Sequence, residues 1–282
     1  MHTWQIRDRV LQIGARPLIM GIVNVTPDSF SDGGQFGTTD RAVAHALDLV
    51  AQAADILDIG GESTRPGSHA VAGDEEMRRV LPVIQMLAKK TTVPLSVDTS
   101  KAAVARACLD AGAHIINDVT AMADPLMPEV VRASSAGIIL MHMQGTPATM
   151  QFAPHYDSVI DELMRFFEER LVAARASGIA TEAIAIDPGI GFGKKAAHNI
   201  DILARLEVFQ RLGRPLCLGV SRKGLLGKLL DRPVDQRLAG SLAVICHAMA
   251  HEAAQIVRVH DVRETRDVVI MTDTLKMHRE IQ

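Results

Sequence analysis

Short apolar runs recur eight times along the chain, and each is followed by a polar residue and then by a stretch with helical spacing. The polar residues that follow these runs are Asn24, Glu62, Asp98, Asn117, His142, Asp187, Ser221 and His260. Strands that alternate with helices are typical of parallel sheets. In a closed barrel of eight parallel strands, all the carboxyl ends meet at one mouth. The pattern therefore predicts an α/β protein, a (β/α)8 TIM barrel whose mouth gathers these eight positions.

No linker or low-complexity segment divides the chain, and 282 residues is a usual length for one such barrel. We predict a single domain over residues 1–282, with its core at about 18–278. The expected strands cover about 18–25, 54–59, 95–97, 114–117, 138–141, 183–186, 216–220 and 256–259. The loops after the first two strands, TPDSFSDGGQFGTT and GGESTRPGSHAVAGDEE, are longer than usual βα connections and are candidate lids. The first helix is expected to begin near Asp40.

Composition narrows the range of functions. A net charge of −3 and 3% aromatic residues provide neither a field nor stacking surfaces for nucleic acid. No stretch approaches the roughly 20 apolar residues of a membrane span, and the N-terminal MHTWQIRDRV lacks the apolar core of a signal peptide. The three cysteines are far apart in apolar contexts, which favours free thiols in a reducing compartment. We expect a cytoplasmic protein with small-molecule partners, and neither nucleic acid nor a membrane.

Three of the polar strand ends suit a nitrogen-rich ligand. Asp98, Asn117 and Asp187 have no basic residue directly beside them in the sequence, and a buried carboxylate needs hydrogen-bond donors. Each side chain could cap the following helix or pair across the barrel. Together, at corresponding strand ends, they favour recognition of a flat heterocycle, because carboxylates accept from an amino group and a ring N–H side by side.

The end of the last strand predicts an anion site. Arg258 and His260 are separated by one residue, so both point to the same side of the strand. Barrel phosphate sites commonly use the loops after strands seven and eight. A structural salt bridge and a packed histidine are the alternative. Asn24 precedes a polar loop that could be a solvated turn, but an amide oxygen at this strand end could also ligate Mg2+.

Lys223 opens the helix after strand seven, in VSRKG. It could form a Schiff base, but it follows polar residues and does not lie in an apolar strand, which favours hydrogen bonding. His142 is more typical of a packed histidine, and Glu62 receives no role. The segment DPGIGFGKK lacks the GxxxxGK[ST] spacing of a phosphate loop. Its glycines favour a backbone that bends near a flat ligand, with Phe192 as a wall.

The motifs together resemble one family. The segments that carry the resemblance are MGIVNVTPDSFSDGG, DIGGESTRPG, SVDTSK, HIINDV, LMHMQGTP, DPGIGFGK, VSRKG and VRVHDV. They are similar, in the same order, to the motifs of the dihydropteroate synthases, and they cover about 18–262. The resemblance implies a TIM barrel, usually dimeric and a target of sulfonamides. It also implies an activity, the condensation of (7,8-dihydropterin-6-yl)methyl diphosphate with 4-aminobenzoate to 7,8-dihydropteroate and diphosphate.

The resemblance further implies residue roles. The residues implied in binding the pterin diphosphate are Thr64, Asp98, Asn117, Asp187, Lys223, Arg258, Val259 and His260. Those implied in catalysis are Asp98, Lys223, Arg258 and His260. Those implied in binding 4-aminobenzoate are Phe30, Thr64, Arg65, Pro66, Phe192 and Gly224. Asn24 is the implied ligand of Mg2+, the one implied cofactor. The chain departs from the family at Gly224, where many members have a serine that helps hold the aminobenzoate carboxylate.

The implied reaction starts with departure of the diphosphate, whose charge Mg2+, Arg258 and His260 would stabilise. Asp98 would then stabilise a pterin cation until the aryl amine attacks, in an SN1-like route. Three alternatives stay open. A methyltetrahydrofolate-dependent methyltransferase would share the pterin contacts without needing an anion site. A class I aldolase would use Lys223 as its nucleophile, and a non-catalytic pterin-binding or scaffold protein would release no diphosphate.

Overall fold

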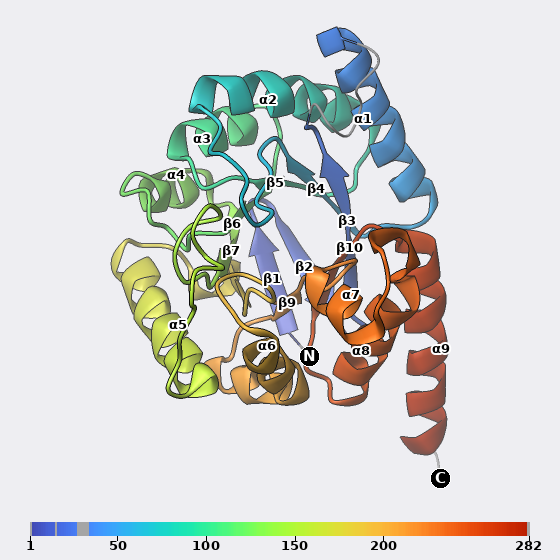
Figure 1. The fold of residues 1–282 in the computed structure, drawn as a ribbon. Coiled ribbons are helices and arrows are strands. Elements are labelled where there is room, and N and C mark those ends of the chain that lie inside the picture. The colour runs from blue at the N-terminus through green and yellow to red at the C-terminus, as the bar shows by residue number, and fades with distance from the viewer. Residues whose placement is uncertain (1, 15, 27–33, 281–282) are drawn as a thin grey trace.

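Eight parallel strands form the centre of the molecule. The computed structural model describes residues 2–14, 16–26 and 34–280. The strands are β3 (Leu18–Asn24), β4 (Ile56–Gly60), β5 (Leu95–Asp98), β6 (Ile115–Asp118), β7 (Gly137–Met141), β8 (Ile184–Asp187), β9 (Cys217–Leu218) and β10 (Ile256–Val259). They pair in the order β8-β7-β6-β5-β4-β3-β10-β9, and an isolated bridge between Ile186 and Leu216 joins β8 to β9. Figure 1 shows the strands inside a ring of helices, which confirms the predicted TIM barrel.

Helices follow the strands around the barrel. They are α1 (Gly34–Ala51), α2 (Gly73–Lys90), α3 (Ala102–Asp110), α4 (Met127–Ser134), α5 (Val159–Ala176), α6 (Ala196–Ala204), α7 (Gly224–Leu230), α8 (Leu238–Ala250) and α9 (Val262–Glu280). Short 3-10 helices cover η2 (Thr181–Ala183), η3 (Leu206–Leu212) and η4 (Val234–Gln236). The expected start near Asp40 is wrong, because α1 already begins at Gly34. Part of the first long loop is therefore helical, and residues 27–33 lie outside the described residues.

Side chains on each strand alternate between the helices and the barrel interior. The outward side chains pack with the helices into the main core, as Leu57 and Ile59 of β4 do with Val80 and Ile84 of α2. The inward side chains near the amino ends form a second apolar cluster. Its strand members are Met20, Ile56, Ile115, Ile139, Ala185, Cys217 and Ile256. One end of the interior is therefore apolar, and the polar inward positions lie toward the carboxyl ends.

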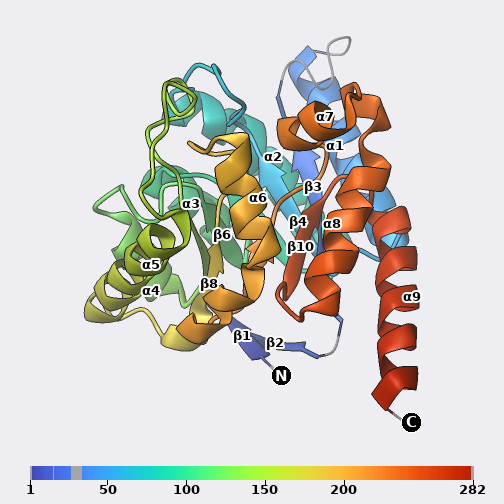
Figure 2. The same cartoon turned by 60° about the horizontal axis from the view of Figure 1, so that its bottom comes forward.

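An N-terminal hairpin, which the sequence analysis did not predict, closes the apolar end. Its strands β1 (His2–Ile6) and β2 (Arg9–Ile13) pair antiparallel. Trp4 and Ile6 are fully buried in the interior cluster, and Trp4 Nε1 donates to the carbonyl of Ala183 at 2.9 Å. Figure 2 shows the hairpin across the lower end of the barrel, opposite α7. The polar interior consequently faces the other end, where the long loops lie.

Candidate active site

The polar strand ends share one level of the barrel. Strand pairing sets Asn24 of β3 level with Gly60 of β4, Gly60 level with Asp98 of β5, and Asp98 level with Asn117 of β6. Because paired residues in neighbouring strands face the same side, these positions all project into the barrel. The structure therefore brings together the side chains that the sequence pattern singled out on these strands.

Arg258 connects the carboxylates of two strands. Its Nε donates to Asp58 Oδ2 at 2.6 Å, and one of its terminal nitrogens donates to Asp98 Oδ2 at 2.8 Å. Asn117 Nδ2 also donates to Asp58 Oδ2, at 3.1 Å. Asp58 is fully buried, while the side chain of Asp98 keeps 11% exposure. Pairing across the barrel, the alternative considered for Asp98, is thus observed. Asp98 remains reachable from the mouth.

Burial sets the charge states of this cluster. Burial raises the pKa of Asp98 to about 7, and the positive charge of Arg258 opposes the shift. Although burial acts in the opposite direction, the carboxylates of Asp58 and Asp98 raise the pKa of Arg258. Arg258 is therefore a permanent cation, and Asp98 titrates near neutral pH.

Asp187 and Lys223 lie on the opposite side of the mouth. Gly189 N donates to Asp187 Oδ1 at 2.7 Å. Lys223 Nζ donates to the carbonyl of Ile190 and lies 4.4 Å from the centre of the Phe192 ring. These contacts agree with a hydrogen-bonding lysine, and the ring supplies an apolar wall beside it.

Both charged groups on this side have shifted pKa values. Burial raises the pKa of Asp187, with Lys223 opposing the shift. Burial lowers the pKa of Lys223 to about 8, with Asp187 opposing the shift. Gly219, which directly follows β9, has no side chain and so leaves space next to these two groups. A Cβ at this position would lie 3.7 Å from Asp187 Oδ2 and 4.0 Å from Lys223 Nζ. A side chain at Gly219 would fill the room that a ligand needs.

His260 is oriented by Ser221. Ser221 Oγ accepts from the backbone N–H of His260 at 3.2 Å, and it lies 3.0 Å from Nδ1 of the same histidine. The direction of the hydrogen bond between Oγ and Nδ1 follows the tautomer of the His260 ring. Burial lowers the pKa of His260 to about 4, helped by the charges of Arg258 and Arg222. At neutral pH the His260 ring is therefore uncharged, so the positive charge at this end comes from Arg258.

The second long loop, residues 61–72, extends over the mouth. It carries Thr64, Arg65 and Pro66, and Gly67 N donates to the carbonyl of Pro147 in the loop after β7 at 3.1 Å. The charge of Arg65 also contributes to the lowered pKa of His260. Loop residues predicted to bind 4-aminobenzoate therefore lie near the strand ends predicted to bind the diphosphate.

The remaining predicted residues differ in how they are placed. Phe30 lies outside the described residues. Gly224 is the first residue of α7, and beyond its chain neighbours and helix backbone no atom of the described residues would lie within 4 Å of a Cβ added to it. Val259 is 1% exposed and packs in the main core, so only its backbone can face a ligand.

Two interior groups were missed by the sequence analysis. Asp58 sits within the apolar run ADILDIGG, where only its position two residues before Gly60 indicates an inward-facing side chain. Lys194 of GFGK is 3% exposed and lies 2.9 Å from His142 Nδ1, so the predicted packed histidine has a buried lysine as its partner. Glu62, which received no role, accepts from Val71 N at 3.1 Å and from Lys101 Nζ.

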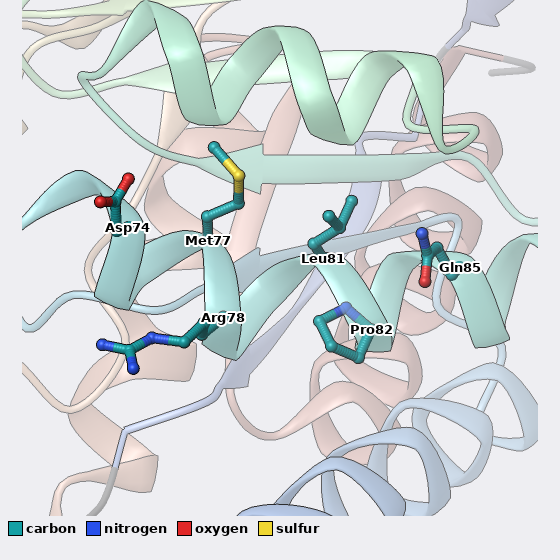
Figure 3. Close-up of a pocket in the computed structure, with 6 residues that line it drawn as sticks. All are labelled: Asp74, Met77, Arg78, Leu81, Pro82 and Gln85. Carbon is teal, nitrogen blue, oxygen red and sulfur yellow. The ribbon is translucent and has the colours of Figure 1, made fainter.

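A shallow surface groove lies elsewhere, along α2 (Figure 3). The residues that line it are Asp74, Met77, Arg78, Leu81, Pro82 and Gln85. All six belong to one helix, and none is a predicted site residue. The groove is therefore separate from the barrel mouth. In the described part of the chain, no helix is long and apolar enough to cross a membrane.

Comparisons with known proteins identify the family of the chain. Residues 20–260 match the family model described as pterin binding enzyme, so the chain belongs to the pterin-binding enzymes. The dihydropteroate synthase of Escherichia coli K12 is 45% identical over 94% of both chains. Two solved structures from Xanthomonas albilineans are similarly close. Its dihydropteroate synthase with 4-aminobenzoic acid is 47% identical over 97% of this chain and 98% of that chain, with a TM-score of 0.91. The same enzyme with 7,8-dihydropteroate is 45% identical over the same shares, with a TM-score of 0.88.

Within the pterin-binding enzymes, these similarities point to one family, the dihydropteroate synthases. The relatives match nearly their whole length, and the structures superpose over the entire barrel. The chain is thus a member of the dihydropteroate synthase family, which consists of transferases.

Proposed function

We propose that the chain condenses (7,8-dihydropterin-6-yl)methyl diphosphate with 4-aminobenzoate, giving 7,8-dihydropteroate and diphosphate. The observation that supports it most directly is the position of Arg258 between Asp58 and Asp98, in a mouth that also holds Asn117 and Asp187. This arrangement supports the proposal, because it offers a cation to a diphosphate and hydrogen-bond acceptors to a pterin within one barrel mouth. The product complex of the Xanthomonas albilineans relative agrees with this assignment.

The pterin is proposed to bind between the two sides of the mouth. Asp98 and Asp187 would accept from its amino and ring N–H groups, and Asn117 can both donate and accept. Lys223 would donate to a ring nitrogen or carbonyl oxygen. The backbone N–H of Gly189 occupies one oxygen of Asp187, and the missing side chain at Gly219 leaves room beside the other.

The diphosphate is proposed to bind at Arg258, at His260 and at the backbone of Val259, with Thr64 reaching from the loop. Mg2+ is proposed to bind here through Asn24 and the diphosphate. The donor set fits this arrangement: Asn24 supplies a neutral amide oxygen at the strand end, and the described residues contain no group of three or more His, Cys, Asp or Glu that could hold a metal ion by themselves. When bound, the metal would neutralise charge on the leaving diphosphate.

The reaction is proposed to be SN1-like. Arg258 and His260 would stabilise the negative charge that develops on the leaving oxygen. The carboxylate of Asp98 would stabilise the pterin cation until the amine of 4-aminobenzoate attacks the exocyclic carbon. Crystals that trap substrates in a concerted, associative geometry, with no cation formed, would contradict this route.

4-Aminobenzoate is proposed to bind on the outer side of the pterin. Phe30, Pro66 and Phe192 would contact its ring, together with Thr64 and Arg65 of the second loop. Its carboxylate would face Gly224, at the amino end of α7, where backbone N–H groups point outward.

The working molecule is proposed to be a homodimer in the cytoplasm. Ile270, Met271, Leu275 and Met277 of α9 are each at least 47% exposed, an apolar surface that a second copy would cover. Cys108 and Cys217 are buried free thiols, which suits a reducing compartment.

Incubation with both substrates and Mg2+ tests the proposed function. We expect dihydropteroate from the native chain and strongly reduced product from Asp98→Ala and Arg258→Ala, with released diphosphate measured in parallel. Absence of product from the native chain would overturn the assignment. A substrate adduct trapped on Lys223 by borohydride would instead favour an aldolase.

A further inference from the structure

Lys194 is a buried lysine that the proposed reaction does not use. Its Nζ lies 2.9 Å from His142 Nδ1, 2.9 Å from the carbonyl oxygen of Phe192 and 3.0 Å from that of Gly189. The carbonyl oxygen of His142 is slightly farther away, at 3.3 Å. Burial lowers the pKa of Lys194 to about 7, and in its charged form the ammonium group has three N–H donors, one for each of the three nearer acceptors.

His142 completes this arrangement as an acceptor. Burial lowers the pKa of His142 to about 3, and the charge of Lys194 adds to the shift. The ring is therefore neutral, and Nδ1 can accept from Lys194 when the proton is on Nε2. Phe166 packs edge-on against the ring at 4.8 Å between centroids, which fixes its orientation.

Two of the four acceptors belong to the glycine loop, residues 188–193 between β8 and α6. Gly189 and Gly193 have positive φ angles of 67° and 60°, a conformation that other residues rarely adopt. A Cβ on Gly189 would lie 1.9 Å from the carbonyl oxygen of His142, and one on Gly193 would lie 2.3 Å from that of Gln144. The glycines thus let this loop pack on the end of β7 and wrap around the ammonium group.

The same loop supplies the two contacts of Lys223. Ile190, whose carbonyl accepts from Lys223, follows Gly189, whose carbonyl is bound to Lys194. Phe192 uses its ring beside Lys223 Nζ and its carbonyl for Lys194. We infer that Lys194 is a positioning residue: it holds the glycine loop in the conformation that fixes Lys223, and it acts on the reaction through Lys223. The inference rests on the proposed role of Lys223 in binding the pterin.

A double-mutant cycle in the full chain tests this role. The variants are Lys194→Met, Lys223→Ala and both together, with kcat/KM for the pterin diphosphate measured at saturating 4-aminobenzoate. Lys195→Met is the matched control, because Lys195 is the exposed neighbouring lysine. We expect Lys194→Met to lower kcat/KM about ten- to a hundredfold in the native background and less than about threefold in the Lys223→Ala background.

Other outcomes separate this inference from the proposed function. If all variants fold and the losses of kcat/KM from Lys194→Met and Lys223→Ala simply multiply in the double variant, Lys194 does not act through Lys223. That result would overturn the inference and leave the proposed activity standing. Absence of product from the native chain would overturn both. If Lys194→Met fails to fold by circular dichroism, His142 replaces it in the cycle. His142→Leu, which removes the acceptor, should then depend on Lys223 in the same way, whereas His142→Asn, which keeps an acceptor, should stay near native. Equal losses from the two His142 variants would overturn the inference.

Discussion

At the scale of single residues, burial brings the pKa values of two charged groups in the site close to neutral pH. The pKa of Asp98 is raised to about 7 and that of Lys223 is lowered to about 8, in each case mainly by burial. His260, with its pKa lowered to about 4, stays neutral over the same range. Because Asp98, Lys223 and Arg258 influence one another, the observed values will belong to the coupled group.

The activity should therefore depend on pH in a bell-shaped manner. If the reaction needs ionised Asp98, kcat/KM for the pterin diphosphate falls as the pH drops below about 7. If it needs charged Lys223, kcat/KM falls as the pH rises above about 8. Lys223→Arg keeps the charge at all these pH values, so the alkaline limb should move upward. An alkaline limb that stays in place in this variant would exclude Lys223 as its source.

Gly224 gives a second prediction at this scale. Gly224→Ser adds a hydroxyl at the amino end of α7, where no atom of the described residues, apart from the chain neighbours and helix backbone, lies within 4 Å of the new Cβ. One hydrogen bond to a carboxylate, about 1.5 kcal/mol or more, would tighten 4-aminobenzoate binding about tenfold. Calorimetric titration with 4-aminobenzoate, with the pterin site filled by diphosphate substrate analogue, measures the change. Unchanged or weaker affinity would argue against a contact at this position, and Gly224→Ala, which adds only a methyl, is the control.

At the scale of elements, the strand ends were predictable because the apolar runs stop there. Asp98, Asn117 and Asp187 end β5, β6 and β8 within one residue of the expected positions. Asp58 could not be predicted in the same way, because it lies inside the apolar run of β4 and its partner Arg258 is 200 residues away. The pairing depends on barrel closure, which no local pattern records.

The base of the second long loop, residues 61–72, is also held by contacts between residues that are distant in sequence. Glu62 accepts from Val71 N at the far end of the loop and from Lys101 Nζ at the start of α3. Lys101 also donates to the fully buried Glu76 at 2.6 Å. Although burial acts against it, the carboxylates of Glu62 and Glu76 raise the pKa of Lys101. Lys101 consequently ties the loop to two helices.

Lys101→Met should loosen this loop. We expect a several-fold rise in KM for 4-aminobenzoate with little change in KM for the pterin diphosphate, because the loop residues are proposed to contact the first substrate. Steady-state kinetics with each substrate varied in turn measure the split. Lys89→Met, at an exposed lysine of α2, is the control. Since Lys101→Met leaves Glu76 buried without a cation, Glu62→Gln provides a milder variant. An equal rise in both KM values would mean that the anchor supports the whole mouth.

At the scale of the whole molecule, the barrel separates an apolar end from a polar end. The eight-strand pattern was sufficient to predict the barrel and the convergence at its mouth. The closing hairpin was missed, because β1 and β2 are short and the elements that β1 contacts, namely η2, β7 and β8, are distant in sequence. The hairpin packs at the apolar end of the barrel, opposite the mouth, so stability and activity should be separable in this fold.

Trp4→Ala tests that separation. Trp4 is fully buried, and its removal leaves a cavity and an unpaired carbonyl at Ala183. Loss of a buried tryptophan costs about 3–5 kcal/mol of folding free energy. Urea unfolding followed by circular dichroism measures this, since Trp4 is the chain's one tryptophan and its fluorescence is lost with it. Below the unfolding transition, kcat and both KM values should match the native chain, because the mouth lies at the opposite end.

Val10→Ala, at a 55% exposed position of β2, is the control and should leave the urea midpoint unchanged. A native midpoint for Trp4→Ala would mean that the hairpin contributes nothing to the core, and altered KM values at native stability would mean that the two ends of the barrel are coupled.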